Sequence, residues 1–391
     1  MKDTYDVVVI GAGPAGSIAA RTTAQAGLST LLIEKRQEIG SPVRCGEAAG
    51  RPSVEAFLPV DPKWVCADVH VYSVYNAQGD CVTVPPEEDT IILERKIFDR
   101  EVAHAAARAG AEVMVKARAT GLLRDGRAIA GVKMVVQGEP REVQAKIVIG
   151  ADGTESQTPR WAGLKSIPPL KNYYAAAQYL MTDIDCDPHT CQYHVGWSIA
   201  PGGYCWVFPK GGRQANIGIV VWVDPKQTRS AVQYLNDFTA MRFPGKSILS
   251  QVVGGIPVTD VLPDMVTDGY LCVGDAAHQS DPLTAGGITN SMCGGLFAAE
   301  TAAEAIKAGD VSARRLKPYE RRWDAEFGQT YRRLFRIRQA VLKVPEAKLS
   351  KMIADASRLD VSKMSLKDIV GIVLRSHPLL LLEIGPYFLR Q

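Results

Sequence analysis

The most restrictive feature of this chain is a glycine-rich turn set between two apolar segments near its N-terminus. Residues 5–10 predict a buried strand that runs directly into Gly11-Ala12-Gly13-Pro14-Ala15-Gly16. Residues 17–26 predict a helix that ends at Gly27, and residues 29–33 predict a second strand, which Glu34 follows. A strand, a glycine turn, a helix and a strand ending at an acid are typical of a dinucleotide-binding fold.

Each glycine of this turn has its own physical task. Gly11 makes the tight turn, Gly13 lets the backbone approach a pyrophosphate, and Gly16 lets the helix pack closely on the sheet. Free N–H groups and the positive end of the helix dipole then attract the phosphates. The carboxylate of Glu34 can accept a hydrogen bond from a ribose hydroxyl. We therefore predict a Rossmann-like domain.

Two later segments favour FAD over NAD. Residues 270–278 predict a short strand that ends in Gly-Asp, and Gly286-Gly287-Ile288 open a helix expected over residues 290–308. Asp275 can hold the ribitol chain of a flavin, and the helix N-terminus can face the ring system where negative charge gathers on reduction. Residues 147–153 predict another strand, which ends at Asp152. In this order, the three segments resemble the FAD-binding motifs of the flavoprotein hydroxylase superfamily.

Composition limits the alternatives. The 391 residues suffice for two joined domains, and 46% hydrophobic and 22% charged residues are typical of a globular protein. The net charge of +3, with no basic face that carries interleaved aromatic residues, argues against nucleic-acid binding. Eight cysteines and no apparent signal or targeting segment favour a reducing cytoplasm. No apolar segment approaches the roughly 20 residues of a spanning helix.

A cysteine loop narrows the resemblance. Residues 41–47 (Ser-Pro-Val-Arg-Cys-Gly-Glu) follow Glu34-Lys35-Arg36, and together they resemble the geranylgeranyl reductases, which saturate the double bonds of prenyl chains. The similarity is nearest to the archaeal branch that acts on digeranylgeranylglycerophospholipid. In that family a Cys-Gly pair lies near the flavin, which the resemblance carries over to Cys45 and Gly46. The family usually has glycine where this chain has Ala48, so a methyl group there is expected to alter the flavin loop slightly.

A second segment carries the same resemblance. Residues 201–209 (Pro-Gly-Gly-Tyr-Cys-Trp-Val-Phe-Pro) predict a strand in which Tyr204, Trp206 and Phe208 share one face, because side chains alternate with period two. Such a face is either an ordinary core or the wall of a channel for an isoprenoid chain. The similarity extends from Tyr5 to about Tyr319.

The resemblance implies a full set of site residues. The arginine of the motif over residues 93–99, Arg95, is expected to touch the cofactor, with a surface salt bridge as the alternative. Ala119, expected at the start of a loop, corresponds to the family's contact on the adenine side. The implied cofactor residues are Gly11, Gly13, Ala15, Gly16, Glu34, Lys35, Cys45, Gly46, Ala48, Arg95, Ala119, Asp152, Asp275, Gly286, Gly287 and Ile288.

The expected fold is α/β. A discontinuous FAD-binding domain (residues 1–62, 93–170 and 264–320) is interleaved with a mostly antiparallel β-sheet substrate domain (63–92 and 171–263). A helical region (321–391) follows.

The isolated double bonds of a prenyl chain require a proton as well as a hydride, since hydride addition alone would leave a localised carbanion. Cys45 is the first candidate for the proton donor, with Tyr204 or a water second. The electrons are expected from outside the chain, from reduced ferredoxin or NAD(P)H, because cysteines at iron–sulfur spacing are missing.

Other readings stay open. The substrate could instead be geranylgeranyl diphosphate or a prenylated quinone. An FAD-dependent monooxygenase and a non-enzymatic prenyl-lipid carrier with structural FAD are the rivals from other classes. Cys186, His189, Cys191 and His194 resemble a zinc-ligand set, but their spacing is too tight, so no metal is expected.

The C-terminal region suggests contact with a membrane. Residues 331–343 predict a strongly basic helix with apolar residues at helical spacing, which fits either a docked helix or a surface helix on an anionic bilayer. The segment 378–382 (Pro-Leu-Leu-Leu-Leu) is too short to span a membrane. We therefore expect a cytoplasmic protein that is peripheral on the inner face of the cell membrane, with Arg332, Arg333, Arg336 and Arg338 as its contact.

Overall fold

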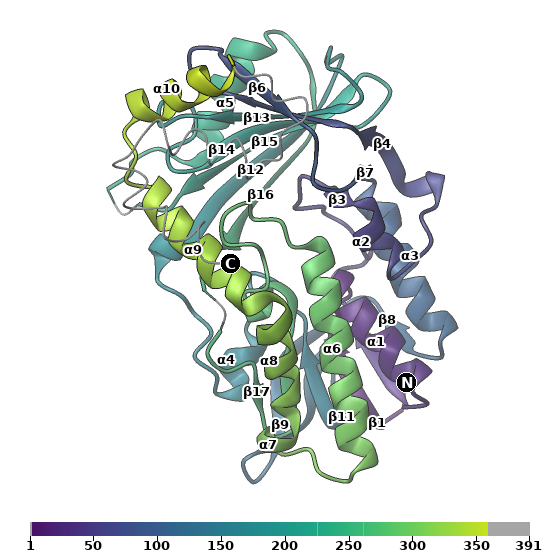
Figure 1. Ribbon diagram of the computed structural model, residues 1–391. Helices are drawn as coiled ribbons and strands as arrows, with labels where there is room; N and C mark the ends of the chain where they lie inside the picture. Colours follow the sequence, from purple (N-terminus) through teal and green to yellow (C-terminus); the bar gives the residue numbers. More distant parts are fainter. Residues whose placement is uncertain (1, 225, 261, 359–391) are drawn as a thin grey trace. The chain divides into compact units, whose positions relative to one another are not determined.

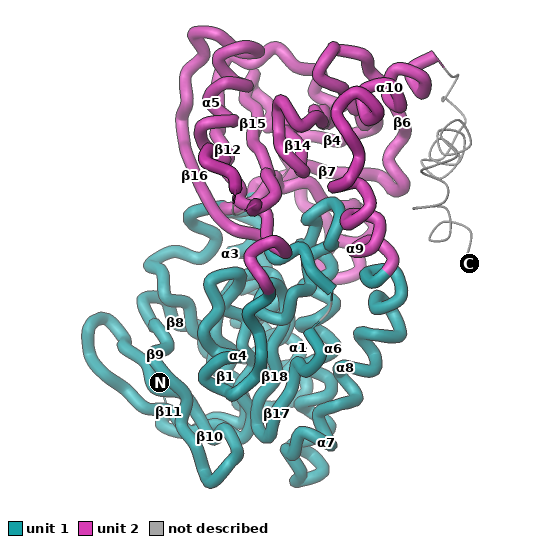
Figure 2. Tube along the Cα trace, turned by 90° about the vertical axis from the view of Figure 1, so that its left-hand side faces the viewer, with its two compact units in different colours: residues 1–43, 95–168, 257–332 teal, residues 44–94, 169–256, 333–391 magenta. Residues whose placement is uncertain are grey.

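A computed structural model describes residues 2–224, 226–260 and 262–358, and the chain divides into two compact units (Figures 1 and 2). The first unit comprises residues 1–43, 95–168 and 257–332, and the second comprises residues 44–94, 169–256 and 333–391. Each unit draws on three separate stretches of chain, whereas the prediction gave the substrate domain two stretches and set residues 321–391 apart as a helical region. The predicted division also differs at residues 44–62, which lie in the second unit because residues 48–50 join a sheet there, and at residue 332, where the first unit ends inside the predicted helical region.

The first unit is built on a sheet whose central strands are parallel. Its order is β17-β18-β11-β1-β2-β8, and a hairpin of β9 and β10 extends from β11. Four parallel pairings join neighbouring strands across the sheet, in the spatial order β18, β11, β1, β2 and β8. The strands are β1 (Thr4–Ile10), β2 (Thr30–Ile33), β8 (Glu112–Met114), β9 (Ala117–Asp125), β10 (Ala128–Val136), β11 (Glu139–Gly150), β17 (Val266–Thr267) and β18 (Tyr270–Cys272).

Helices pack on this sheet through small residues. α1 and α6 lie side by side, and α1 also contacts α3 (Figure 1). β1 and β2 are almost wholly buried, which suits parallel strands covered on both faces. The helical segments are α1 (Pro14–Gln25), α3 (Arg95–Arg108), α4 (Thr158–Ala162), η3 (Gly274–Ala277), α6 (Ile288–Lys307), α7 (Ala313–Leu316), α8 (Pro318–Trp323) and η4 (Asp324–Gly328).

The second unit contains a larger, mainly antiparallel sheet. Its order is β16-β12-β15-β14-β13-β5-β6, in which β13 and β5 pair in parallel, while the β12–β15, β15–β14, β14–β13 and β5–β6 pairs are antiparallel. A small sheet, β3-β7-β4, lies in the same unit. The strands are β3 (Ala48–Gly50), β4 (Val65–Val69), β5 (Val71–Tyr75), β6 (Cys81–Val84), β7 (Thr90–Leu93), β12 (Tyr173–Thr182), β13 (Thr190–Val195), β14 (Tyr204–Pro209), β15 (Gln214–Trp222) and β16 (Ile248–Pro257).

Few helices belong to the second unit. α5 (Ala231–Arg242) covers one face of β12 and β15 and begins with a capping box between Ser230 and Gln233. The other segments are α2 (Arg51–Glu55), η1 (Pro62–Trp64), η2 (Leu170–Asn172) and α10 (Glu346–Ala356), and α9 (Gln329–Val341) begins in the first unit and ends in the second. Across the described ranges, no helix has both the length and the apolar character needed to cross a bilayer.

Two local predictions are wrong. The first helix begins at Pro14 rather than residue 17, because the fixed φ of proline suits the first turn of a helix. Ala119 lies within β9, where it pairs with Met134 beside a register shift, and not at the start of a loop. Residues 124–127 (Arg-Asp-Gly-Arg) connect the β9–β10 hairpin, in which Asp125 pairs with Ala128.

Candidate functional site

In the first unit, the three predicted cofactor motifs meet at their turns. A side chain on Gly11 would lie 2.3 Å from the carbonyl oxygen of Ala151, so the first two turns touch through backbone. The Thr154 hydroxyl donates a hydrogen bond of 2.9 Å to Asp275, which joins the second motif to the third. Ala15 joins the first motif to the third, since its Cβ lies 3.2 Å from where a Cβ on Gly274 would stand.

The glycine turn leaves space where a pyrophosphate is expected. A Cβ built on Gly13 would meet nothing within 4 Å, whereas one on Gly16 would lie 1.9 Å from the carbonyl oxygen of Gly11. Gly16 therefore serves close packing, and Gly13 borders open space. The Glu34 carboxylate accepts hydrogen bonds from the amides of Ala12 (3.1 Å) and Arg36 (3.0 Å), which holds it over this turn with acceptor capacity to spare.

Asp275 and Arg95 supply the charges of this region. Arg95 forms a two-pronged ion pair with Asp99, at 2.6 and 2.9 Å, and both side chains are largely buried. The pair is therefore not the surface salt bridge of the alternative reading. Burial raises the pKa of the Asp275 carboxyl, and the Thr154 hydroxyl and the charge of Arg95 offset only part of that effect.

The N-terminus of α6 completes the arrangement. Gly287 is the N-cap residue and has no capping side chain, so the first N–H groups of the helix have no partner from that side chain. A Cβ on Gly287 would lie 3.8 Å from Asp275, and Gly286 would place one 3.3 Å from Thr284. Ile288 is buried as the first helical residue. Backbone donors and one carboxylate thus adjoin each other, as a flavin site requires.

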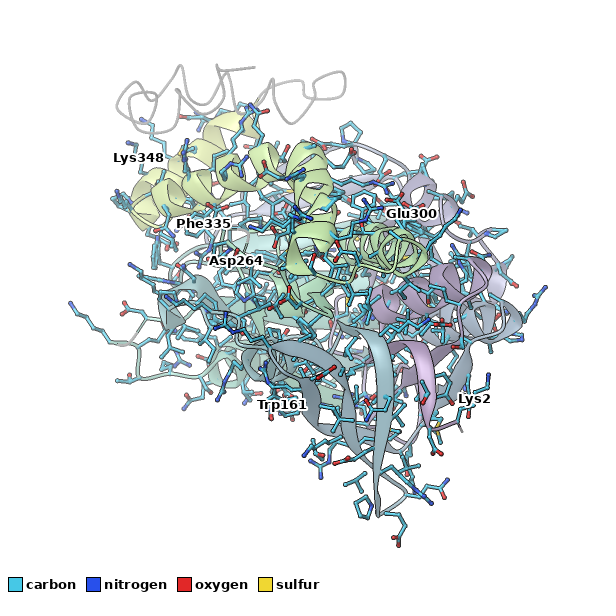
Figure 3. All side chains as sticks on the ribbon, turned by 90° about the horizontal axis from the view of Figure 1, so that it is seen from below. Lys2, Trp161, Asp264, Glu300, Phe335 and Lys348 are labelled. Carbon is cyan, nitrogen blue, oxygen red and sulfur yellow. The ribbon has the colours of Figure 1, made fainter. Side chains whose placement is uncertain are left out.

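Asp152, unlike Asp275, forms its hydrogen bonds within the loop that follows it. Its carboxylate accepts hydrogen bonds from the hydroxyls of Ser156 (2.6 Å) and Thr158 (2.7 Å) and from the amides of Gln157 (2.9 Å) and Thr158 (3.2 Å). These contacts hold the loop that leads into α4, and Trp161 of that helix is labelled in Figure 3. The predicted contact between Asp152 and the cofactor stays a prediction.

Lys35 borders a cavity of about 430 Å³ on the same unit. Lys116 and Arg118 also line the cavity, and Arg118 directly precedes Ala119. Lys35 forms an exposed ion pair of 3.5 Å with Glu155. Lys35, predicted to bind the cofactor, and Ala119, predicted on its adenine side, thus lie in or beside one basic depression.

In the second unit, aromatic rings form a continuous wall. Tyr204, Trp206 and Phe208 share one face of β14, as predicted, with ring centroids 6.0 and 6.2 Å apart. Tyr193 of β13 joins them, at 5.7 Å from Tyr204 and 5.4 Å from Phe208. Trp206 and Phe208 are each only 6% exposed. We call these four residues the aromatic wall.

The predicted Cys-Gly pair lies against this wall. A Cβ on Gly46 would approach Phe208 to 3.0 Å and the indole nitrogen of Trp206 to 3.3 Å. Cys45 is half-buried, and its sulfur accepts a hydrogen bond of 3.2 Å from the amide of Glu47. Ala48 begins β3 and pairs with Ile92 of β7.

Comparison with known proteins shows the same two parts. Residues 6–156 match the model of an FAD dependent oxidoreductase family, and residues 172–256 match the geranylgeranyl reductase catalytic domain. A digeranylgeranylglycerophospholipid reductase of Methanocella arvoryzae is 42% identical over 98% of this chain and 99% of its own. One from Methanosarcina acetivorans is 42% identical over 99% and 97%. This chain belongs to the digeranylgeranylglycerophospholipid reductase family.

Solved structures agree with this membership. The crystal structure of a geranylgeranyl bacteriochlorophyll reductase-like protein from Thermoplasma acidophilum has a TM-score of 0.93 and 36% identity, covering 98% of this chain and 99% of that one. A flavin-dependent brominase has a TM-score of 0.73 at 21% identity, covering 99% and 100%, and this likeness shows the fold alone.

The residues fit the cofactor of this reductase family. FAD needs room at the glycine turn and polar groups at the ends of β2 and β18. The space beside Gly13 and the carboxylates of Glu34 and Asp275 provide both. The chain is an FAD-dependent oxidoreductase.

Sequence reasoning missed several residues around the aromatic wall. Tyr193 pairs with Trp206 across β13 and β14, and Trp206 donates a hydrogen bond of 3.2 Å to Gln178. Gly218 lies opposite Trp206 on β15, where a Cβ would stand 2.1 Å from the indole ring. The turn at Gly211-Gly212 was a usable signal, because it fixes which residues of β14 and β15 face each other.

Lys210 and Asn216 were also missed, together with the role of Glu47. Asn216 lies opposite Phe208 on β15, and Lys210 follows Pro209 at the end of β14. Their contacts with Glu47 join segments more than 160 residues apart, for which the sequence holds no local signal.

The basic helix differs from its prediction. Arg338 is only 1% exposed and lies 4.8 Å from the ring centre of Tyr174, while Arg332 pairs with Asp324. The prediction that the four arginines form one membrane-facing surface is therefore wrong. Phe335 of α9 and Lys348 of α10 are labelled in Figure 3. The apolar segment 378–382 lies outside the described residues.

The segment from Cys186 to His194 continues into β13. Cys191 is buried, and His189 contacts the carbonyl oxygen of Asp68 through its Nδ1 at 2.8 Å. Within the described ranges, no group of His, Cys, Asp and Glu side chains is arranged to hold a metal ion.

Proposed function

We propose that this chain saturates the double bonds of geranylgeranyl chains and that its substrate is digeranylgeranylglycerophospholipid, a precursor of archaeal membrane lipid. The aromatic wall with Gly46 packed against it carries this proposal. The wall lies within the segment matched by the geranylgeranyl reductase catalytic domain, and it offers broad apolar area at low entropic cost. Full-length relatives bear the name of this activity.

The chemistry assigns distinct tasks to the residues. When bound and reduced, FAD supplies a hydride to one carbon of the double bond. The other carbon needs a proton, and we propose that Cys45 donates it, with Tyr204 as the second candidate. The aromatic wall binds the chain, excludes water and favours positive character at the substituted carbon.

The test is an anaerobic turnover experiment. Photoreduced protein mixed with the unsaturated lipid should reoxidise, and the lipid should gain two hydrogens per double bond by mass spectrometry. Comparison with geranylgeranyl diphosphate and a prenylated quinone identifies the preferred head group. Oxygen-dependent formation of a hydroxylated product would instead indicate a monooxygenase, and failure to reoxidise would indicate a carrier.

The role of Cys45 has its own test. A Cys45→Ser variant that binds FAD should reduce lipid far more slowly than the native protein, because a hydroxyl is a much weaker acid than a thiol. Native turnover in this variant would exclude Cys45 as the donor and direct attention to Tyr204. The parallel Tyr204→Phe variant separates the two candidates.

We also propose an external electron donor, either reduced ferredoxin or NAD(P)H. The described part of the chain offers no second glycine turn of the Gly11–Gly16 type for a nicotinamide cofactor. Anaerobic bleaching of the flavin absorbance by each donor, measured separately, distinguishes the two.

We further propose that the protein contacts a membrane surface through residues 241–253. Met241 is 65% exposed, Ile248 48%, Leu249 55% and Val253 50%. Arg242 and Lys246 are exposed within the same segment, which contains no acid. β16 is the outer strand of its sheet, where exposed apolar side chains are normally avoided. A substrate with two long chains makes an anionic bilayer the natural occupant of such a surface.

Liposome co-sedimentation tests this surface. The double variant Ile248→Ser with Leu249→Ser should bind anionic liposomes at least about tenfold more weakly, because it removes two apolar side chains that the bilayer would bury. Turnover on liposome-embedded lipid should fall, while turnover on detergent-solubilised lipid should persist. The matched control is Val115→Ser with Ile167→Ser, two exposed apolar residues of the first unit. Equal binding by all proteins would refute the proposal.

A further inference from the structure

The residue that follows the Cys-Gly pair is held in an unusual conformation. Glu47 has a φ of +74°, in the left-handed region that side chains other than glycine rarely adopt, and it is only 3% exposed. Its amide donates to the sulfur of Cys45 at 3.2 Å, and its carbonyl oxygen accepts from the amide of Leu93 at 2.9 Å. Such a conformation persists only where the surroundings hold it in place.

A buried lysine holds the side chain of Glu47. The ammonium of Lys210 lies 2.9 Å from the Glu47 carboxylate, 3.1 Å from that of Glu94, and 2.7 Å from the carbonyl oxygen of Leu93. These three acceptors match the three N–H bonds of an ammonium group. Burial lowers the pKa of Lys210, but the neighbouring Glu47, Cys66 and Glu94 together more than offset that effect, so the pKa lies above its usual value.

An asparagine completes the network. Asn216 is 2% exposed, and its side-chain amide donates to the Glu47 carboxylate and, at 3.4 Å, to the carbonyl oxygen of Gly46. Asn216 lies opposite Phe208, and Lys210 follows the strand that carries Phe208. The network therefore connects the Cys45-Gly46 segment to β14, which carries three residues of the aromatic wall, and to its neighbour β15.

We propose that Glu47 is a positioning residue for the reduction. Anchored by Lys210 and Asn216, it keeps Gly46 packed on Trp206 and Phe208 and directs its own amide at the Cys45 sulfur. A buried carboxylate and ammonium stabilise this geometry only as a pair, because loss of one partner leaves the other charge buried without compensation. The inference rests on the proposed role of Cys45 as proton donor.

Two substitutions separate the anchor from the backbone turn. Glu47→Gly keeps a residue suited to positive φ and keeps the amide, but it removes the carboxylate anchor. Glu47→Gln keeps the shape and removes the charge. We expect each to lower kcat for lipid reduction at least about tenfold, with KM changed less than about threefold. The matched control is Glu320→Gln in the first unit, a largely buried carboxylate that accepts the amides of Met265 and Val266 at 2.7 and 3.2 Å.

The pH profile of Cys45 alkylation, followed by peptide mass spectrometry, gives a readout that needs no turnover. The midpoint should shift by about half a unit or more in both Glu47 variants, since the amide contact and the carboxylate charge both act on the thiolate. It should not move in Glu320→Gln. The double variant Glu47→Gln with Lys210→Met should recover thermal stability relative to the single variants but keep the altered profile.

Two outcomes would overturn the proposal. One is a native alkylation profile and native kcat in Glu47→Gly and Glu47→Gln, with only thermal stability reduced, because Glu47 would then merely support the fold. The other is full recovery of both readouts in the double variant, because neutralising a buried charge would then explain everything. If Cys45→Ser alone retains native turnover, the proposed function of Cys45 fails, while the alkylation profile still reports whether Glu47 directs the thiol.

Discussion

At the scale of single residues, glycines shape the aromatic wall by leaving space for rings. Gly218 gives the indole of Trp206 its place, and Gly46 lets the cysteine segment pack directly on Phe208. Neither glycine has a positive φ, so close approach and not backbone conformation is the reason for each. A side chain at either position would move a ring of the wall.

The first prediction concerns Gly218. Gly218→Ala should destabilise the protein by about 1–3 kcal/mol, because its methyl group would stand 2.1 Å from the ring of Trp206 and the ring has to shift. We also expect KM for the lipid to rise. The control is Gly121→Ala in β9, where the nearest atom, on Lys133, lies 3.7 Å away. Thermal unfolding and steady-state kinetics measure both effects, and an unchanged Gly218→Ala protein would contradict the steric account.

At the scale of elements, the close approach of α1 and α6 organises the first unit. A Cβ on Gly295 of α6 would lie 2.2 Å from the carbonyl oxygen of Ala15 in α1, so the two helices touch through backbone. The same region of α1 carries the glycine turn, and the N-terminus of α6 carries Gly286 and Gly287. Helix packing therefore sets the spacing between two predicted FAD-binding turns.

The second prediction compares two glycines of these elements. Gly13→Ala should leave the melting temperature of the FAD-free protein unchanged, since its methyl group would meet no protein atom within 4 Å. It should weaken FAD binding at least about tenfold, because that space is needed for the pyrophosphate. Gly295→Ala should lower both stability and FAD affinity by forcing the helices apart. If Gly13→Ala bound FAD as tightly as the native protein, the pyrophosphate could not lie at this turn.

At the scale of the whole molecule, two buried histidines make stability depend on pH. Burial lowers the pKa of His194 in the second unit to about 3, with the charge of Arg242 adding to the effect, and it lowers the pKa of His278 in the first unit to about 4. His194 stacks on Tyr75 at 4.7 Å, and His278 contacts the carbonyl oxygen of Ser166 at 2.9 Å. Both rings are therefore neutral at neutral pH.

The third prediction is loss of stability in acid. Below pH 6.5 the unfolded chain binds protons on both histidines and the folded chain does not, so stability falls as the pH drops from about 6.5 towards 4. Each unit of pKa difference corresponds to about 1.4 kcal/mol. His194→Phe should flatten this decline, because phenylalanine also suits a site beside Tyr75 and Phe238. Denaturant unfolding at several pH values measures the slope, with the exposed His104→Phe as control.

Local patterns were enough to predict the elements that carry the candidate site. The glycine turn, the helix after it and the alternation of Tyr204, Trp206 and Phe208 each arise from neighbours in sequence, and the observed elements follow them. Order and spacing of the three motifs also predicted the interleaved α/β fold. These features depend on backbone periodicity and turn chemistry, which short segments determine by themselves.

Only the tertiary structure decided which polar groups meet. The pairing of Glu47 with Lys210 and Asn216, the four donors around Asp152 and the burial of Arg338 were not predictable. Arg338 shows the reason most clearly. Its place in a basic amphipathic helix predicted exposure, but whether a long cation lies in solvent or against a tyrosine depends on what packs against that turn. The sequence determined the elements and their order. Packing between distant segments determined which charged groups are buried and which polar groups contact each other inside each unit.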